Sequence, residues 1–529
     1  MKGKKRVLKH ALPWMALIAA YAVSLTFYGL YGMHNLDADI SSEMILARIL
    51  NEEGSLTTLT KSWLYSSELR IVSPVPLYQL GLRLFSSWHA ARTFAVALIL
   101  LLIASSTLFM AREAGFGESA PWLAAVLMLP FSKTYAYIVI YGGFYSMHLA
   151  CSFVLLGLIC RCAKKGLRGS ALELSLIALL SLIGGLGGVR MLTMFIVPAF
   201  GAAVLLAISE FTELSTFREG AHRPAVRMAE AAGISILLAA AGYLYNAGAL
   251  ARAYRFDDHS YLKIQSFDGS EWALQISRML GDLGARTNEL FFSQKGLSTF
   301  AVLAYFAVMC FSLWRLASRW RERTARQKLF ALTSVIAVAL GMTLVILLRQ
   351  GFSRYYIVGT LMLLAVPFFA WEVCSCKNGM LRTGAFALAV AFFLFQSSLV
   401  MRFDYTQNPA NYEVAADWLL ERGYTQGYAT YWYSNTLTEA SDGQIEMWAL
   451  EFWKPEDWMN LKVQAGLQQT DHLERDPEGR VFLLVDEMEN TQSTPLFDEA
   501  HLAGFVAWSY YIYEYDSVDE MRALISQAE

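Results

Sequence analysis

Charged residues are scarce in this 529-residue chain: Asp, Glu, Lys and Arg together make up 17% of it, whereas 56% is hydrophobic. Soluble globular domains average about 25% charged residues, so the composition excludes a soluble protein, and it equally excludes a disordered or collagen-like chain. Only six cysteines are present, all in or beside apolar segments, which excludes a disulfide-rich secreted scaffold. The chain is therefore expected to be an integral membrane protein.

Several functional motifs are also missing. Basic residues form no stripe with interleaved aromatics, so nucleic acid is excluded as a partner. The C-terminal part has neither a glycine-rich phosphate loop nor a nucleophile elbow. Cys374 and Cys376 are spaced too closely for a typical zinc ligand pair, and we interpret all six cysteines as packing residues.

Charge is divided unevenly along the chain. Residues 1–401 hold 36 Lys and Arg against 21 Asp and Glu, whereas residues 402–529 hold 7 against 24. We therefore expect two parts, a basic hydrophobic body over 1–401 and an acidic domain over 402–529.

Long apolar runs dominate the basic part and predict about eleven transmembrane helices. Pro130 and Lys133 interrupt the third run, which is the weakest of the set. The runs lie near 12–31, 93–111, 119–139, 146–161, 171–188, 191–208, 231–248, 298–316, 329–348, 356–371 and 384–401.

The distribution of Lys and Arg predicts the orientation. If the N-terminus is cytoplasmic, every second loop is cytoplasmic, and those loops carry the basic clusters, as the positive-inside rule requires. An odd number of spans then places residues 402–529 outside, together with the loops 32–91 and 249–297. The prediction is a multi-pass protein with a cytoplasmic N-terminus and an extracytoplasmic C-terminal domain.

Local patterns predict elements in the outer segments. Ser41–Asn51 and Leu77–Phe85 are too short to span and are predicted as helices lying in the membrane interface. The C-terminal domain mixes helical and strand periods, which predicts a small α/β domain. Its expected elements are a helix ending near Arg422, strands at Tyr428–Tyr433, Ile445–Leu450, Val481–Val485 and Phe505–Tyr513, and a last helix opened by Ser517 and Glu520.

An acidic cluster follows the first span by a few residues. Asp37 and Asp39, with Glu43 one turn further on, could supply a general base or bind a divalent cation such as Mg²⁺ or Mn²⁺. The alternative is that Asp39 caps the interfacial helix and Asp37 is solvated. Position at a membrane interface, beneath a large outer domain, favours the functional interpretation.

Arginines also gather at the predicted outer ends of the spans. Guanidinium groups at that depth could hold a lipid phosphate through paired hydrogen bonds, or they could only anchor the helices in the interface. His148 and His259 are interpreted as structural. The candidate phosphate ligands are Arg70, Arg92, Arg190, Arg349 and Arg354, with Tyr355 beside the last.

Together these features resemble the GT-C superfamily of polytopic membrane glycosyltransferases, which includes protein mannosyltransferases and aminoarabinose transferases. The resemblance is carried by Asp37 and Asp39 after the first span, Pro74 and Pro76 before the second interfacial helix, Ala90-Ala91-Arg92 and Arg354-Tyr355. It implies a polyprenyl-phosphate sugar donor, a catalytic carboxylate in the first outer loop, and transfer at the outer face of a bacterial plasma membrane. The chain departs from many relatives in having Asp-Ala-Asp in place of Asp-Glu, and Ser73 where they have lysine, whose phosphate role would then pass to Arg70.

The leading hypothesis is an inverting glycosyltransferase in which Asp37 deprotonates an acceptor hydroxyl on an extracytoplasmic glycan, lipid or protein. Asp39 or Glu43 would orient that hydroxyl or hold a cation, and Arg92 and Arg354 would neutralise the leaving phosphate. Two alternatives stay open. One is a flippase or transporter of lipid-linked saccharides, although the spans show no charged lining. The other is a non-catalytic component of an envelope polysaccharide assembly system.

Overall fold

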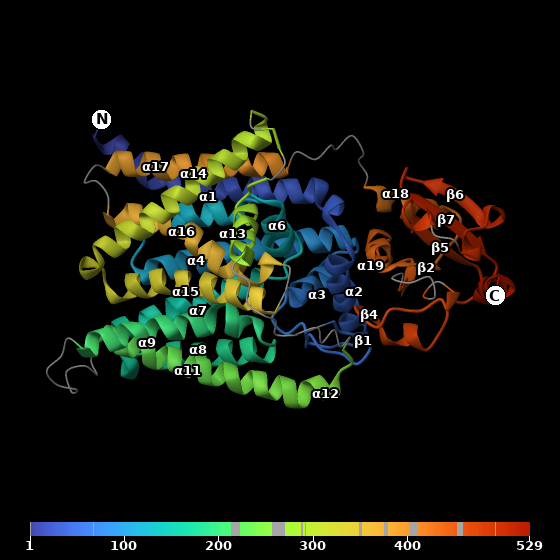
Figure 1. The fold of residues 1–529 in the computed structure, drawn as a ribbon, viewed down its shortest axis with the longest axis horizontal. Helices are drawn as coiled ribbons and strands as arrows, with labels where there is room; N and C mark the ends of the chain where they lie inside the picture. Colours follow the sequence, from blue (N-terminus) through green and yellow to red (C-terminus); the bar gives the residue numbers. More distant parts are fainter. Residues whose placement is uncertain are drawn as a thin grey trace.

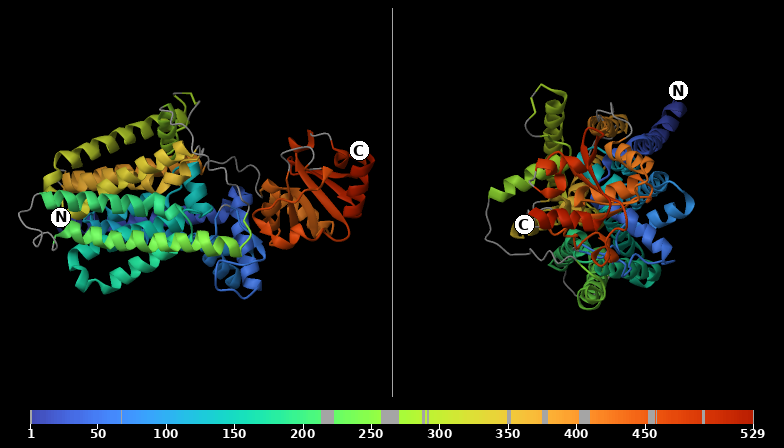
Figure 2. Two further views of the ribbon diagram at one scale, coloured as in Figure 1. Left: turned by 60° about the horizontal axis from the view of Figure 1, so that its bottom comes forward. Right: turned by 90° about the vertical axis from the view of Figure 1, so that its right-hand side faces the viewer.

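A bundle of apolar helices carries a mixed α/β domain at one of its ends (Figure 1; Figure 2). The start of α1 (Lys2–Tyr31) lies at the opposite end from this C-terminal domain. The computed structural model describes residues 2–66, 68–212, 223–256, 270–286, 289–290, 292–348, 352–374, 379–401, 410–451, 457, 459–491 and 494–528. The predicted domain boundary after residue 401 adjoins residues 402–409, outside this part, so the two-domain division stays a prediction.

Within the described residues, nine helices are long and apolar enough to cross a membrane, which agrees with a multi-pass membrane protein. They run nearly parallel along the long axis of the molecule (Figure 2). They are α1, α4 (Trp88–Ala114), α7 (Ser146–Lys165), α9 (Val197–Thr212), α11 (Pro224–Tyr245), α14 (Gln294–Ser318), α15 (Ala325–Leu347), α16 (Ile357–Cys374) and α17 (Gly379–Val400).

Two of the eleven predicted spans differ from the prediction. The third is broken: α5 (Ala120–Met128) is followed at an angle of 86° by α6 (Lys133–Tyr135) and the π-helical turn η2 (Ala136–Tyr141). Pro130 lies at the break, where its missing N–H cannot continue the helix. The fifth, α8 (Ala171–Leu186), has only 16 residues, fewer than the roughly 20 that a straight span needs.

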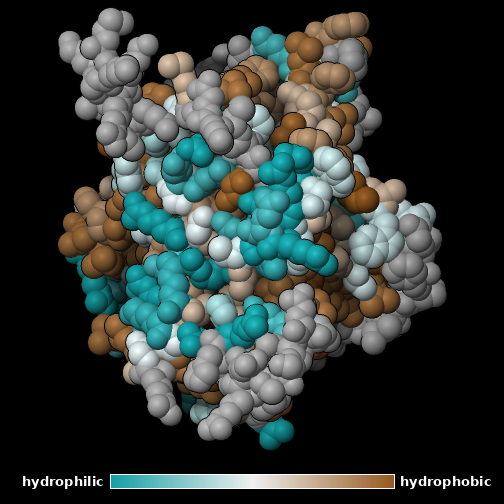
Figure 3. Space-filling model, turned by 90° about the vertical axis from the view of Figure 1, so that its left-hand side faces the viewer, coloured by the Kyte–Doolittle hydropathy of each residue, from teal (hydrophilic) through white to brown (hydrophobic). Residues whose placement is uncertain are grey.

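Basic side chains gather at the end of the bundle away from the C-terminal domain, where Figure 3 shows a hydrophilic surface. Glu113 accepts ion pairs from Arg161 at 3.2 Å and Lys164 at 2.6 Å, and its carbonyl accepts from Arg326. These three residues belong to loops predicted to be cytoplasmic. The basic end and the C-terminal domain therefore lie on opposite ends of the bundle, and which end faces the cytoplasm stays a prediction.

The first outer loop forms two helices close to their predicted positions. α2 (Ala38–Glu52) and α3 (Val75–Leu84) are both too short to span. Pro74 precedes α3, and Pro76 lies in its first turn, where a missing N–H breaks no helical bond. The second outer loop contains α13 (Ser270–Asp282), which the sequence did not predict.

The C-terminal domain is built on a five-stranded sheet in the order β3-β2-β5-β7-β6. β2 pairs parallel with β3 and β5, and β7 pairs antiparallel with β5 and β6. The strands are β2 (Gln426–Thr430), β3 (Glu446–Leu450), β5 (Val481–Asp486), β6 (Leu502–Val506) and β7 (Tyr510–Tyr515); the helices are α18 (Asn411–Glu421), α19 (Tyr431–Ala440) and α21 (Val518–Ala528). This confirms the predicted fold class.

Two predicted strands are partly wrong. Tyr431–Tyr433 begins a helix, α19, instead of ending a strand. Phe505–Tyr513 is a hairpin, because Ala507 and Trp508 both adopt a φ of +55° and turn the chain back. Neither residue is a Gly, Asn or Asp, the residues that usually signal such a turn.

The C-terminal domain docks directly onto the first outer loop. β1 (Trp63–Leu64) from that loop pairs antiparallel with β4 (Gln468–Gln469) from the domain. α19 packs against α2, and the Asn435 side chain donates a hydrogen bond to the carbonyl of Ala38 at 3.4 Å. The two segments, about 400 residues apart in the sequence, form one continuous structure.

A buried ion pair stands at the centre of this contact. The guanidinium of Arg92 on α4 donates two hydrogen bonds to the carboxylate of Glu439 on α19, at 2.5 and 2.7 Å. Both side chains are fully buried. Arg92 also donates to the carbonyl of Ile40 on α2 at 3.2 Å, so one guanidinium joins α2, α4 and α19.

We expect Glu439→Gln to destabilise the docked protein by about 3–5 kcal/mol, because it leaves a buried guanidinium without a counter-charge. The measurement is the thermal unfolding midpoint of the purified protein, together with protease susceptibility of the C-terminal domain. Glu474→Gln is the matched control, since Glu474 pairs with Arg255 at 3.4 Å while both are more than half exposed, and such pairs contribute about 0–1 kcal/mol. Equal midpoints for the two variants would contradict this account.

Candidate functional site

Asp37 is the N-cap of α2 and lies half-buried between the membrane helices and the C-terminal domain. Its carboxylate accepts a hydrogen bond from the backbone N–H of Ile40 at 2.8 Å. Burial raises the pKa of the Asp37 carboxyl above its ordinary value, against the opposing effect of a hydrogen bond from Tyr137. The cap of the interfacial helix is thus Asp37 and not Asp39, and Asp37 is not a solvated surface residue.

Asp39 is held by the C-terminal domain. The hydroxyl of Tyr431, the first residue of α19, donates a hydrogen bond to its carboxylate. Asp39 also keeps part of its surface exposed. Tyr431 is a site residue that the sequence did not reveal, because it falls in a run interpreted as a strand.

Glu43 lies one turn further along α2 and is only 1% exposed. The guanidinium of Arg70 is 3.6 Å from its carboxylate, too long for a hydrogen bond, and neither oxygen accepts one from the described residues. Burial raises the pKa of Glu43 to about 7, although Arg70 and Arg92 oppose the shift. Near neutral pH this carboxyl is therefore divided between its two protonation states.

A second pair of opposite charges, Arg190 with Glu68, lies near Arg70 and Glu43. Arg190, in the turn between α8 and the π-helical turn η4 (Leu192–Ile196), pairs with Glu68 at 2.8 Å. Its guanidinium lies over the rings of Tyr145 at 5.4 Å and Tyr355 at 5.9 Å. Arg70 lies over Phe144, the neighbour of Tyr145, at 5.7 Å. The turn between η2 and α7, just after the broken third span, therefore places aromatic rings beneath two of the arginines. Glu68 is another residue that the sequence did not single out.

Arg354 completes the cluster from the short helix η7 (Ser353–Tyr356). Its guanidinium packs over the rings of Phe352 at 4.5 Å and Tyr355 at 5.4 Å. Burial raises the pKa of Glu68, and the charge of Arg354, with those of Arg190 and Arg70, opposes the shift. No carboxylate of the described residues forms an ion pair with Arg354, and its buried Nε makes no hydrogen bond to them. Arg349 lies outside the described residues.

The fold therefore gathers most of the predicted site residues at one end of the bundle. Asp37, Asp39 and Glu43 come from one helix, and Arg70, Arg190 and Arg354 from three distant segments. Arg92 lies close to the same carboxylates but is fully buried and paired with Glu439. The Nε and Nη2 atoms of its guanidinium are engaged by the C-terminal domain and α2, so the half-buried Arg70, Arg190 and Arg354 are the more accessible arginines, and the phosphate role of Arg92 stays a prediction.

A basic cavity of about 460 Å³ opens beside Ser353, the neighbour of Arg354. Its charged lining consists of Lys133, Arg278, Arg286 and Lys295 with Asp282 and Glu289. Asp282 is 2% exposed and accepts a hydrogen bond from the Ser353 hydroxyl at 2.9 Å. This cavity is a second place where a phosphate could meet positive charge.

Metal ligands are not concentrated at the acidic motif. Across the described part of the chain, no three or more His, Cys, Asp or Glu side chains are arranged to hold a metal ion. Asp37 and Asp39 are instead engaged by Tyr137 and Tyr431.

Comparison with solved structures identifies the fold. The chain is similar to ArnT from Cupriavidus metallidurans bound to undecaprenyl phosphate, with 12% identity and a TM-score of 0.58 over 94% of this chain and 97% of ArnT. The apo state of ArnT gives 13% identity and a TM-score of 0.58 over 97% of this chain and 99% of ArnT. An oligosaccharyltransferase from Archaeoglobus fulgidus in the apo form has 12% identity and a TM-score of 0.48, over 82% of this chain and 64% of the oligosaccharyltransferase. No family model and no curated protein sequence matches the chain. The chain has the GT-C fold of ArnT, as its sequence features led us to expect.

The raised pKa of Glu43 predicts a pH-dependent stability difference. A carboxyl whose pKa is about 7 when folded and about 4.5 when unfolded favours the folded state when protonated. That contribution is fully present below pH 4.5 and is lost as the pH rises to 7. We expect Glu43→Gln, which mimics the protonated form, to gain thermal stability relative to the wild type at pH 8 but not at pH 4.

The size of the gain is on the order of a few kcal/mol, since one pKa unit corresponds to about 1.4 kcal/mol. Thermal unfolding midpoints of both proteins at the two pH values measure it, and the other titrating groups cancel in the comparison. A difference between the proteins that does not change with pH would show that Glu43 does not titrate in this range.

Proposed function

We propose that this chain is a membrane glycosyltransferase that moves a sugar from a polyprenyl-phosphate donor to an acceptor outside the cytoplasm. Two observations support it. The fold is that of ArnT, which has been solved with undecaprenyl phosphate bound. The observation that carries the proposal is the convergence of three arginines and the acidic motif, from four separate segments, at the end of the bundle beneath the C-terminal domain.

The arginines suit a departing lipid phosphate. As the sugar–phosphate bond breaks, negative charge accumulates on the phosphate, and fixed guanidinium groups stabilise it without rearranging. Arg70 and Arg190 each lie beside a carboxylate, Glu43 and Glu68, which keeps their charge partly balanced before the donor arrives. Arg354 has no such partner among the described residues, so its guanidinium is the one most available for paired hydrogen bonds to phosphate.

Asp37 suits the role of general base. Its raised pKa makes it a stronger base than an exposed aspartate. In a single displacement, the acceptor oxygen bonds to the anomeric carbon as the bond from that carbon to the phosphate oxygen breaks. The acceptor proton passes to Asp37, the bonding electrons leave with the phosphate, and the configuration inverts. Asp39, held by Tyr431, would orient the acceptor.

The location of the reaction follows from the predicted orientation. The site lies at the end of the bundle that carries the C-terminal domain, opposite the basic end. With the N-terminus in the cytoplasm, the acceptor would be an extracytoplasmic glycan, lipid or protein of the cell envelope, and the enzyme a multi-pass protein of the plasma membrane.

Replacing Asp37 by Asn should lower transfer by at least 10²–10⁴-fold, the range attributed to a positioned general base. Because Asn also caps helices well, the variant should fold like the wild type. Turnover is measured with purified protein and a polyprenyl-phosphate sugar, and folding by the thermal unfolding midpoint. Wild-type turnover in this variant would remove Asp37 from the mechanism.

Replacing Arg354 by Lys separates phosphate binding from helix anchoring. Lysine keeps the charge but loses the planar pair of donors, so donor affinity and turnover should both fall by about tenfold or more if Arg354 grips the phosphate. The matched control is Arg252→Lys, because Arg252 is exposed on α12 (Ala251–Ala253). If Arg354→Lys and the control have the same kinetics, Arg354 only anchors its helix, and Arg190 or Arg70 becomes the phosphate ligand to examine.

A further inference from the structure

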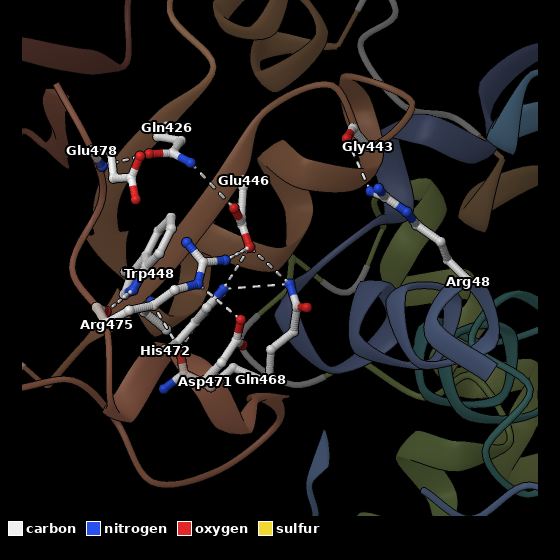
Figure 4. A network of polar contacts seen from close by, with 12 residues as sticks. Arg48, Gln426, Gly443, Glu446, Trp448, Gln468, Asp471, His472, Arg475 and Glu478 are labelled. Carbon is white, nitrogen blue, oxygen red and sulfur yellow. Dashed lines mark hydrogen bonds and ion pairs between the residues drawn. The ribbon is translucent and has the colours of Figure 1, made fainter. Parts of the chain in front are cut away.

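A polar cavity of about 300 Å³ lies between α2 and the C-terminal domain, separate from the arginine cluster. α2 contributes Arg48 and Glu52 to its wall, and the domain contributes Gln426, Glu446, Gln469 and His472. Figure 4 shows the network on the domain side, with Arg48 approaching from α2 to donate to the carbonyl of Gly443 at 3.0 Å. The volume lies at the lower end of the range of small-molecule sites.

The polar groups of this wall are held in place by one another. Glu446 accepts hydrogen bonds from His472 at 3.1 Å, from Gln469 at 3.2 Å and from Arg475 (Figure 4). His472 is 4% exposed, and its ring stacks on Trp448 with 4.2 Å between centroids. A network fixed in this way loses little side-chain entropy when a ligand binds.

The lining suits an uncharged ligand with several hydroxyl groups. Its charges are paired internally: Arg48 with Glu52 at 2.6 Å, and Glu446 with Arg475. The lining residues include no unpaired cation, so the cavity does not favour a phosphate. The polar lining also disfavours an apolar chain. The amide oxygen of Gln426 accepts from the backbone N–H of Glu478 at 2.7 Å, and the amide nitrogen of Gln469 donates to Glu446 at 3.2 Å. The groups left to meet ligand hydroxyls are the second N–H of Gln426 and the carbonyl oxygen of Gln469.

The cavity and the acidic motif lie along the same two helices. On α2, Asp39 and Arg48 are nine residues apart, about 13 Å along the axis at 1.5 Å per residue. On α19, Tyr431 bonds Asp39, while Asn435 and Thr438, one and two turns further on, line the cavity. The interval between the cavity and Asp39 therefore matches the length of a few sugar units.

We infer that this cavity binds a saccharide unit of the acceptor, at a distance of a few sugar units from the hydroxyl that receives the new sugar. That the bound saccharide belongs to the acceptor rests on the proposed function. The binding itself needs neither donor nor turnover. Recognition would come from the C-terminal domain and α2 together, so the docked domain would select acceptors that carry a suitable glycan.

The test is saturation-transfer NMR on the full-length protein in lipid nanodiscs without donor. The probes are free glucose, galactose, mannose, N-acetylglucosamine and the β-linked disaccharide of N-acetylglucosamine. We expect saturation transfer to at least one of them. Gln426→Ala and Gln469→Ala should each weaken its binding by about threefold to tenfold, the effect of one lost hydrogen bond.

Gln527→Ala is the matched control, because Gln527 is exposed on α21, away from the cavity, and should bind the sugar like the wild type. Thermal unfolding midpoints verify that each variant is folded. No transfer to any probe would overturn the inference, and so would binding that Gln426→Ala and Gln469→Ala both leave unchanged. Sugar binding by a protein that transfers no sugar would support this cavity while counting against the proposed function.

Discussion

The buried ion pair between Arg92 and Glu439 is the contact on which the site depends. It joins a membrane helix to the C-terminal domain with both partners excluded from water, where an unpaired charge would be strongly unfavourable. Because Arg92 also donates to the backbone of α2, the pair fixes α2, α4 and α19 relative to one another. The C-terminal domain therefore contributes directly to the site.

This arrangement brings carboxylates and arginines together in one site. The carboxylates of α2 lie next to the domain, and Arg70 and Arg190 lie beyond them, each with a carboxylate partner. Arg354 stands without one among the described residues. A base in the same site as a cation without a carboxylate partner is the arrangement that an acceptor hydroxyl and a departing phosphate need. Phe144 and Tyr145, in the turn that follows the broken third span, pack against Arg70 and Arg190 respectively.

Much of the fold could be predicted from the sequence, because span length and loop charge are local properties. The apolar runs gave most of the helices, and α2 and α3 were expected near their observed bounds. The 86° bend near Pro130 could be predicted only as an interruption of the third apolar run, because hydropathy does not indicate the angle between two helices. The hairpin around Ala507 and Trp508 was missed because neither residue signals a turn.

The site was only partly predictable. Its acidic motif and most of its arginines follow from residue type at a span end, but their partners do not. Glu439 lies 347 residues from Arg92, and Tyr431 lies 392 residues from Asp39. No local pattern marks either residue, since only the docking of the C-terminal domain brings them to the motif. The sequence could therefore suggest a phosphate role for Arg92 but could not reveal its buried partner, Glu439.

The most direct measurement is a cryo-electron microscopy structure of the full-length protein with undecaprenyl phosphate. The account predicts the phosphate within hydrogen-bond distance of the Arg354 guanidinium, with Arg70 or Arg190 as a second ligand, on the side that Asp37 faces. A phosphate bound instead in the basic cavity lined by Arg278 and Arg286, or one that contacts none of the three clustered arginines, would contradict it.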